Sequence, residues 1–352
     1  MNQATLILLE ISLSHGAFPV ISFKGFFVSL GKLTTMNRIL SVFSIALIIL
    51  MSSCQQGEKK ITIGYVQISP DPVLDAARDG VFKALRDSGF IDGQKIKILE
   101  KNAQSDLSMI TMILQSFQSQ NVDMVITNGT PCMNAAAQTI KGIPVVFTVA
   151  FSPEQIGLKN PPATLTGIFD ELRVKEIVDL MLECKPGIKR IGFPYNNAEP
   201  NAEYSAKMLD KEFAARGIEV IHATVNSTND ILQSTQYLIG KQIDALVAAA
   251  DNTVYLGLNA LTKIAAEHKI PVFVTDPMQV DKGAAVGIGA DYSDWGYQSG
   301  LKAVEILRGK KPSETPIAAM KKYQIAINQK AAAAQGLVIP QSVVARADKI
   351  VQ

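Results

Sequence analysis

Short apolar runs alternate with amphipathic segments along the chain from residue 60 onward. The apolar runs are rich in β-branched residues and predict strands over 61–67, 95–101, 122–127 and 144–149. Between them, apolar residues at helical spacing predict helices over 72–88, 105–120 and 131–140, with Pro72 and Pro131 in the first turn. Strands separated by helices indicate βαβ units, and right-handed crossovers bring the carboxyl ends of their parallel strands to one edge, where ligands bind.

The same order of elements repeats in the second half of the chain. Strands are predicted there over 189–195, 217–224, 243–247 and 269–273. The third of these runs, Ile-Asp-Ala-Leu-Val from Ile243, matches Val-Asp-Met-Val-Ile from Val122 at an offset of 121 residues. Four matched runs in the same order predict an α/β fold of two Rossmann-like lobes, each with a parallel sheet, joined by a hinge.

An apolar run over 39–51 stands apart from this pattern. Its length of roughly 20 Å as a helix is short of the ~30 Å hydrocarbon core of a bilayer. With Arg38 before it and Ser52-Ser53 after it, the run predicts a signal peptide over 36–53. The segment Met51-Ser52-Ser53-Cys54 is similar to a lipobox, although lipoboxes usually carry Leu where Met51 stands. We therefore expect lipidation of Cys54 and a polar tether over 54–59; the alternative is an ordinary cleaved signal peptide with an incidental cysteine.

Residues 1–35 do not fit a signal peptide, which begins close to its positive charge. Met36 stands two residues before Arg38. We expect translation to start at Met36 and residues 1–35 to be an upstream mis-start; the alternative is a long leading segment containing Glu10. In both cases residues 1–53 are not part of the fold.

Composition and charge restrict the function. A chain of 352 residues with 47% hydrophobic and 19% charged residues is globular and long enough for two domains. The net charge of +2 is accounted for by residues 1–53, so the rest is neutral and lacks the basic excess of a nucleic-acid binder. The three Cys and three His are scattered, which argues against a structural zinc site or a disulfide framework. Neither a phosphate-binding loop nor a GxSxG motif occurs, so we expect no metal, no cofactor and no enzymatic activity.

Several stretches over residues 60–328 resemble the ABC-transporter substrate-binding family that includes tryptophan- and tyrosine-binding lipoproteins. They are Ile63-Gly64-Tyr65-Val66-Gln67, the run over 72–80, Gly129-Thr130-Pro131, Leu165-Thr166-Gly167-Ile168, the run over 189–196, and Asp251-Asn252-Thr253. Two positions depart from the family pattern. The family often has His where Asp71 stands and Asp-Pro where Ser152-Pro153 stands.

This resemblance implies the type I periplasmic binding protein fold, whose chain crosses between lobes three times. We expect the crossings near 164–170, 284–290 and 314–323, with the first lobe over 60–167 and 287–315 and the second over 168–286 and 316–352. The implied protein is a monomeric, lipid-anchored receptor of the cell envelope. It captures a small molecule, an amino acid and possibly an aromatic one by the resemblance, and delivers it to the permease and ATPase subunits of an importer. The alternatives are a receptor for a nucleoside or sugar, or a secreted α/β enzyme; a transcription regulator would need a DNA-binding segment where the signal peptide stands.

The ligand is expected between the lobes, on loops at the carboxyl ends of strands. Thr130 and Pro131 open a helix whose free N–H groups favour a carboxylate, while Asp251, followed by Asn252, offers a charge for an ammonium group. The alternative for Asp251 is a purely structural helix cap. The other candidates, also near strand ends, are Gln67, Asp71, Phe151, Tyr195, Asn196 and Asp276. Phe151 and Tyr195 are expected either to stack on the ligand or to pack between lobes, and Trp295 to pack its helix onto the first lobe.

Overall fold

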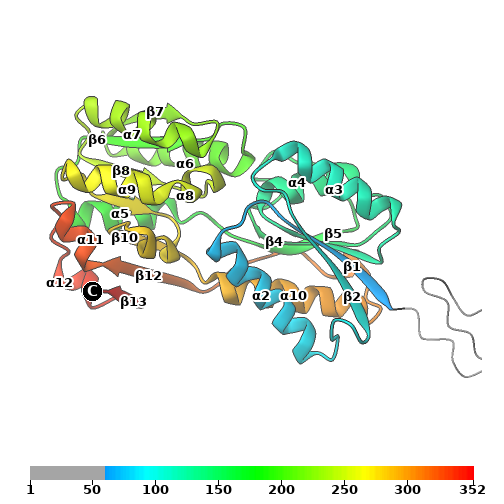
Figure 1. Ribbon diagram of the computed structural model, residues 1–352. Helices are drawn as coiled ribbons and strands as arrows, with labels where there is room; N and C mark the ends of the chain where they lie inside the picture. The colour runs from blue at the N-terminus through cyan, green and yellow to red at the C-terminus, as the bar shows by residue number, and fades with distance from the viewer. Residues whose placement is uncertain (1–59) are drawn as a thin grey trace, which may run out of the picture. The chain divides into compact units, whose positions relative to one another are not determined.

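The computed structural model describes residues 60–352, which form two α/β lobes (Figure 1). The predicted mis-start, signal peptide, Cys54 and tether lie outside the described residues. The first sheet is parallel throughout and contains, in pairing order, β11 (Ala318–Ala319), β5 (Leu165–Phe169), β4 (Val145–Ala150), β3 (Met124–Asn128), β1 (Ile61–Gln67) and β2 (Ile96–Asn102). Its helices are α2 (Pro72–Asp87), α3 (Leu107–Ser119), α4 (Thr130–Thr139) and α10 (Tyr292–Leu307).

The second sheet is also mostly parallel. Its order is β13 (Lys349–Val351), β12 (Tyr323–Asn328), β10 (Val286–Ala290), β9 (Val272–Val274), β8 (Ala245–Ala248), β6 (Arg190–Tyr195) and β7 (Glu219–Thr224). Only the pairing of β10 with β12 is antiparallel among these described strands. Its helices are α5 (Val174–Cys184), α6 (Pro200–Ala215), α7 (Ile231–Gly240), α8 (Asn252–Leu256), α9 (Leu258–Glu267), α11 (Gln329–Ala334) and α12 (Gln341–Val344). Residues 60–352 also contain three short 3-10 helices: η1 (Thr228–Asp230), η2 (Pro277–Lys282) and η3 (Pro312–Glu314).

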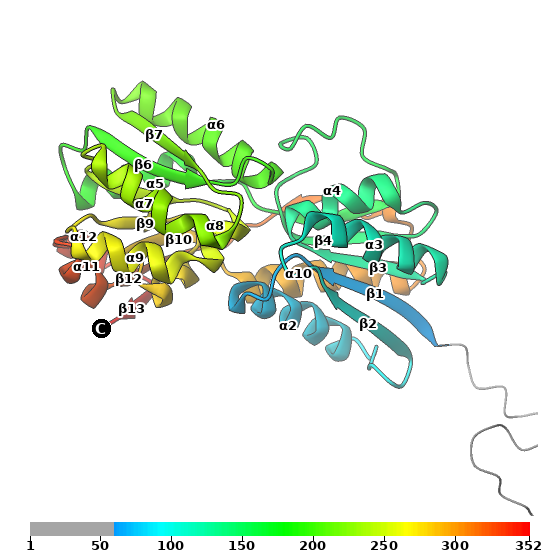
Figure 2. The same ribbon diagram turned by 45° about the horizontal axis from the view of Figure 1, so that its top comes forward.

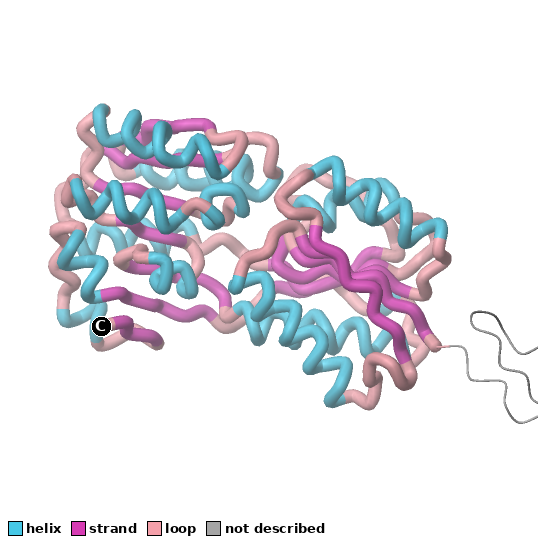
Figure 3. Tube along the Cα trace, viewed as in Figure 1, coloured by secondary structure: helices cyan, strands magenta, loops and turns pink. Residues whose placement is uncertain are grey.

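Helices cover both faces of each sheet, which confirms the predicted α/β class of two sheet-containing lobes (Figures 2 and 3). In the first lobe, α3 and α4 lie on one face and α2 and α10 on the other (Figure 2). Helices α2 and α10 approach closely because glycines meet backbone there: a Cβ atom on Gly296 would lie 1.8 Å from the carbonyl oxygen of Ala77. A Cβ atom on Gly80 would lie 2.2 Å from the carbonyl oxygen of Ser293.

The chain passes between the sheets after β5, after β10 and after β11. Hydrogen bonds tie these crossing segments together. The Tyr323 hydroxyl donates to Asp170 Oδ1 at 2.6 Å, and Gln324 Nε2 donates to Asp291 Oδ2 at 2.9 Å. Asp291 also caps α10, which follows a strand of the second sheet but packs on the first lobe. The crossing segments therefore form one hydrogen-bonded cluster beside the gap between the sheets.

Two features of residues 60–352 bear on other functions. None of the described helices is both long and apolar enough to span a bilayer. In the same part of the chain, no cluster of three or more His, Cys, Asp or Glu side chains is arranged to hold a metal ion.

Candidate ligand-binding site

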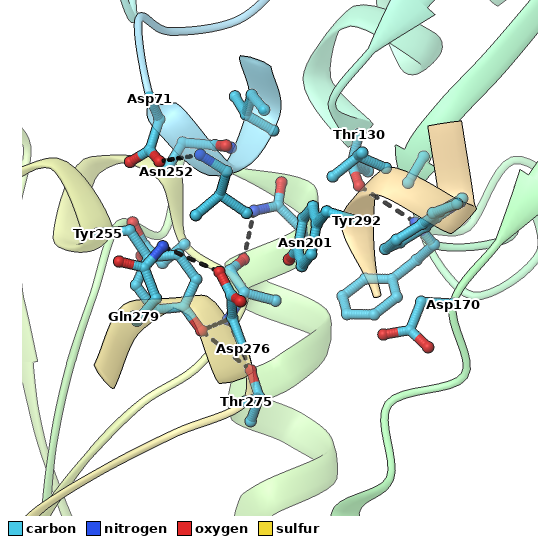
Figure 4. A pocket seen from close by; sticks show the side chains of 18 of the residues that line it. Asp71, Thr130, Asp170, Asn201, Asn252, Tyr255, Thr275, Asp276, Gln279 and Tyr292 are labelled. Carbon is cyan, nitrogen blue, oxygen red and sulfur yellow. Dashed lines mark hydrogen bonds between the residues drawn. The ribbon is translucent and has the colours of Figure 1, made fainter. Parts of the chain in front are cut away.

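A cavity lies between the lobes, where loops from the carboxyl ends of both sheets meet (Figure 4). Its empty space measures about 620 Å³ when the part open to solvent is included. The first lobe and the crossing segments contribute Ser69, Asp71, Val73, Leu74, Thr130, Val149, Ala150, Phe151, Asp170, Leu172, Tyr292 and Trp295. The second lobe contributes Asn201, Ala250, Asp251, Asn252, Tyr255, Thr275, Asp276 and Gln279. A ligand in this cavity would touch both lobes at once.

Six of the residues predicted from the sequence come together in this lining: Asp71, Thr130, Phe151, Asp251, Asn252 and Asp276. They are brought together by topology, because each stands just after a strand of a parallel sheet and the two sheets direct their carboxyl ends toward the same gap.

The other four predicted residues, Gln67, Pro131, Tyr195 and Asn196, are not among the described residues that line the cavity. Gln67 is buried and donates through Nε2 to Ser69 O at 2.8 Å. Tyr195 stacks on Phe193 with ring centroids 5.6 Å apart, on a face of the second sheet. Pro131 is buried in the first turn of α4, and Asn196 lies behind the lining, where its backbone N–H holds Asp251.

Asp251 is 1% exposed and caps the short helix α8. Its Oδ1 accepts from the backbone N–H of Val254 at 2.9 Å and its Oδ2 from that of Asn196 at 2.6 Å. Burial, together with the nearby Glu199 carboxylate, raises the pKa of Asp251 well above its ordinary value. The expected structural alternative, helix capping, is thus present, and Asp251 is also among the residues that line the cavity.

Thr130 and Asp251 hold different positions relative to the helices that follow them. Gly129, with φ of 110°, caps α4, and Asp251 caps α8. The residue of the second lobe that matches Thr130 is therefore Asn252, the first residue of its helix. Thr130 Oγ1 accepts from the backbone N–H of Phe151 at 3.2 Å, which leaves the Thr130 hydroxyl hydrogen free to donate toward the cavity.

A buried glutamate that sequence reasoning missed organises the loop around Asp251. Glu199 is 3% exposed, and its Oε1 accepts from the backbone N–H of Thr253 at 3.0 Å and from the Thr253 hydroxyl at 2.8 Å. Its Oε2 accepts from Asn252 and from Asn201 Nδ2, the latter at 3.1 Å. Glu199 therefore holds two lining residues, Asn201 and Asn252, in place without being among the lining residues itself.

Asp276 forms a second buried carboxylate site in the wall. It is 1% exposed and caps η2, with Oδ1 accepting from the backbone N–H of Met278 at 2.8 Å. Its Oδ2 accepts from Gln279 Nε2 at 2.9 Å. Burial raises the pKa of Asp276 to about 7, although the Gln279 hydrogen bond acts in the opposite direction. The same effect of burial raises the pKa of Asp170 to about 7, against the hydrogen bond from Tyr323.

Asp71 makes an ion pair between the lobes. Its carboxylate caps α2 of the first lobe and accepts from Lys282 Nζ, at the end of η2 in the second lobe, at 2.6 Å. Lys282 Nζ also donates to the carbonyl oxygen of Tyr255 at 3.0 Å. The side chains of Asp71 and Lys282 are 5% and 18% exposed. The ion pair therefore lies largely out of solvent, beside the cavity.

Aromatic side chains form part of the remaining wall. Tyr292 and Trp295 pack with ring centroids 5.5 Å apart, and Phe151 packs on Tyr204 of the second lobe at 5.0 Å. Trp295 Nε1 donates to the carbonyl oxygen of Ile168 at 2.8 Å, so this residue packs α10 onto the first lobe as predicted and also lines the cavity. The apolar faces beside buried carboxylates suit a ligand with one apolar and one charged end.

Sequence reasoning missed several lining residues, among them Asn201, Tyr255, Gln279 and Tyr292. Tyr292 follows the end of a strand by two positions, so the rule that ligands bind at the carboxyl ends of strands could have identified it. Asn201 and Gln279 lie inside helical turns after a proline, and neither carries a sequence signal that separates it from a surface amide.

Comparison with known proteins identifies relatives along most of the chain. The family model described as ABC transporter substrate binding protein matches residues 62–351. A tyrosine-binding protein of Clostridioides difficile is 32% identical over 276 residues, covering 77% of this chain and 80% of that protein.

Solved structures give the same result. A conserved domain protein from Vibrio cholerae is 31% identical to this chain, with a TM-score of 0.79. An ABC domain from Streptococcus pneumonia in complex with L-Trp is 26% identical, with a TM-score of 0.78. Each of these two comparisons covers 83% of this chain and 100% of the other. A ligand-free, open substrate-binding protein from Clostridium difficile is 32% identical with a TM-score of 0.62, over 83% of this chain and 99% of the other. More distant matches, under 25% identical, include sugar-binding proteins and share the fold alone.

Proposed function

Since this chain belongs to the ABC transporter substrate-binding protein family, we propose that it binds an α-amino acid with an aromatic side chain in the cavity between its lobes. Membership in this family makes the chain a solute-binding component of an ABC transporter rather than an enzyme.

One observation carries the choice of ligand: the carboxylates on the first-lobe side, Asp71 and Asp170, are already held by Lys282 and Tyr323, whereas the second lobe adds two further buried carboxylates. The first lobe presents the hydroxyl groups of Ser69 and Thr130, and α4 directs its amino-terminal end to the same place. The second lobe presents the carboxylates of Asp251 and Asp276. The first set suits a carboxylate and the second an ammonium group, which together make the backbone part of an amino acid.

Charge supports this orientation of the ligand. The Asp71 carboxylate of the first lobe is already paired with Lys282. Asp251 is buried beside Glu199, and both influences raise its pKa. A ligand ammonium next to Asp251 would offset them, so binding a cationic group there is favourable in a way that binding a neutral group is not.

The apolar wall supports an aromatic side chain. Phe151, Tyr292 and Trp295 offer ring faces and edges beside the polar groups. Two relatives support the same class, since one is described as tyrosine-binding and the other was solved with L-Trp.

Delivery of the ligand follows from the family role. The receptor would be held at the outer face of a membrane by lipid on Cys54, reached through residues 54–59, and would present its ligand to a permease and ATPase subunits. Closure of the lobes around the ligand, each with its own sheet, would create the form that the permease accepts. We expect one copy of the chain to suffice, because residues of both its lobes already enclose the cavity.

Calorimetry on the purified protein tests the ligand class. We expect heat of binding with L-tyrosine or L-tryptophan, and none with glucose or adenosine at the same concentration. Binding of glucose or adenosine in the absence of binding by any aromatic amino acid would overturn the proposal.

A further inference from the structure

Two buried side-chain amides of the second lobe belong to residues that line the cavity, and the oxygen of each accepts no hydrogen bond from the described part of the protein. They are Asn201, which is 5% exposed, and Gln279, which is 0% exposed. Buried amide oxygens without a partner are uncommon in folded proteins, because the lost hydration of the oxygen is not recovered.

The orientation of the Asn201 amide is fixed by its neighbours. Nδ2 donates to the carbonyl oxygen of Ala250 and to Glu199 Oε2, the second at 3.1 Å. Both neighbours are acceptors, so the amide cannot be turned over without placing oxygen against oxygen. The unpaired atom of this amide is therefore Oδ1. In Figure 4, Asn201 lies in the middle of the lining, between Asp71 and Thr130.

Gln279 is built in the same way. Nε2 donates to Asp276 Oδ2 at 2.9 Å, while Asp276 Oδ1 is occupied by the backbone N–H of Met278. Asp276 thus holds the nitrogen of the Gln279 amide and leaves Oε1 as the unpaired atom. Each amide is positioned by a buried carboxylate that takes its donor side.

We propose that Asn201 Oδ1 and Gln279 Oε1 are ligand-contacting acceptors, and that the ligand brings a separate hydrogen-bond donor to each of them. This inference rests on the proposed function. An aromatic amino acid with a polar group on its ring has two such donors, the α-ammonium and the phenol O–H or indole N–H. Phenylalanine has only the first.

The consequence is selectivity. A site that buries an acceptor for a particular donor rejects an analogue without that donor, because the acceptor then stays unpaired. The receptor therefore prefers tyrosine or tryptophan to phenylalanine, and this preference comes from amide oxygens rather than from the size of the cavity.

The test is a set of dissociation constants for three ligands: L-tyrosine, L-phenylalanine, and deaminated tyrosine, hydroxyphenylpropionate, which lacks the ammonium group. The proteins are wild type, Asn201→Ala, Gln279→Met, and Gln335→Met as a matched control. Gln335 is equally buried in the second lobe, but both ends of its amide are paired, with Val272 N and Gly283 O. Thermal melting establishes that each variant is folded.

In the wild type, removing either donor from the ligand should weaken binding by about tenfold to a hundredfold. In Asn201→Ala and Gln279→Met, tyrosine should bind more weakly than in the wild type. In each variant, the loss of affinity caused by removing one of the two donors from the ligand should shrink to about threefold or less. Gln335→Met should show the same loss of affinity as the wild type for each of the two ligands that lack a donor.

Two results would overturn the proposal. One is a wild type that binds phenylalanine as tightly as tyrosine. The other is a pair of variants that weaken all three ligands by the same factor, because a merely structural role gives a uniform loss. A wild type that binds none of the three ligands contradicts the proposed function itself and is distinguishable from both results.

Discussion

The ion pair between Asp71 and Lys282 predicts how replacing one lysine changes ligand affinity. Asp71 belongs to the first lobe and Lys282 to the second, with 2.6 Å between Oδ2 and Nζ. The pair therefore stabilises the arrangement in which the lobes are in contact. Lys282→Met keeps most of the apolar length of the side chain and removes only its charge and donors. We expect this variant to bind ligand more weakly, because the ligand must then bring the lobes together without the ion pair.

The burial of the pair sets the size of the effect. Removing one partner of a buried pair in a fixed structure costs about 3–5 kcal/mol. Here the lobes can separate and return Asp71 to water, which limits the cost. We therefore expect a loss of about 1–2 kcal/mol, or roughly a five- to thirtyfold higher dissociation constant.

The assay is calorimetric titration with L-tyrosine or L-tryptophan, with Lys349→Met as the control. Lys349 Nζ also lies 2.6 Å from a carboxylate, that of Asp281, but both residues are in the second lobe and their side chains are 43% and 52% exposed. An exposed pair within one lobe is worth little, so the control should bind like the wild type. Wild-type affinity in Lys282→Met, or an equal loss in Lys349→Met, would refute the reasoning.

Four further predictions concern the anchor, the cavity and the helix packing. Replacing Asp251 by Ala should weaken amino-acid binding by about ten- to a hundredfold, measured by calorimetry, since a charge-assisted hydrogen bond is lost; wild-type affinity in this variant would contradict a ligand role for Asp251. Labelled palmitate should enter the wild type and not Cys54→Ala, and equal labelling of both would exclude lipidation at this residue. Burial raises the pKa of Asp276 from 3.8 to about 7, so the folded protein holds this proton at pH values where the unfolded chain has lost it. The contribution of Asp276 therefore makes the free energy of unfolding fall as pH rises from about 4 to about 7; urea titrations at several pH values should show a weaker fall in Asp276→Asn, and an unchanged pH dependence would count against the shift. Gly296→Ala should lower the melting temperature by several degrees, because its Cβ would lie 1.8 Å from the carbonyl oxygen of Ala77, and an unchanged melting temperature would mean that the two helices separate without cost.

The order of strands and helices and the two-lobed class could be predicted from the sequence because they depend on local periodicity. The runs over 61–67 and 189–195 are strands in the structure, within one residue of their predicted bounds. Residues in the loops that follow strands, such as Asp71 and Asp276, could be assigned to the cavity because parallel sheets align their carboxyl ends. Tyr195 also ends a strand, but it is not among the described lining residues, and its ring packs on a face of its sheet. A strand end lies at the edge of the sheet, but alternate side chains point to its faces.

Only the tertiary structure decided which polar groups are paired and which remain free. The sequence shows Glu199, Asn201 and Gln279 as ordinary polar residues near helix starts, and nothing in their spacing separates them from surface side chains. Their roles depend on burial and on partners far along the chain, such as Ala250 for Asn201. The ion pair of Asp71 with Lys282 joins residues 211 positions apart. The periodicity of a segment indicates which of its faces packs on its own lobe. Hydrogen bonds between distant loops, in contrast, form only when the chain is folded. Those bonds decide which polar groups are left unpaired.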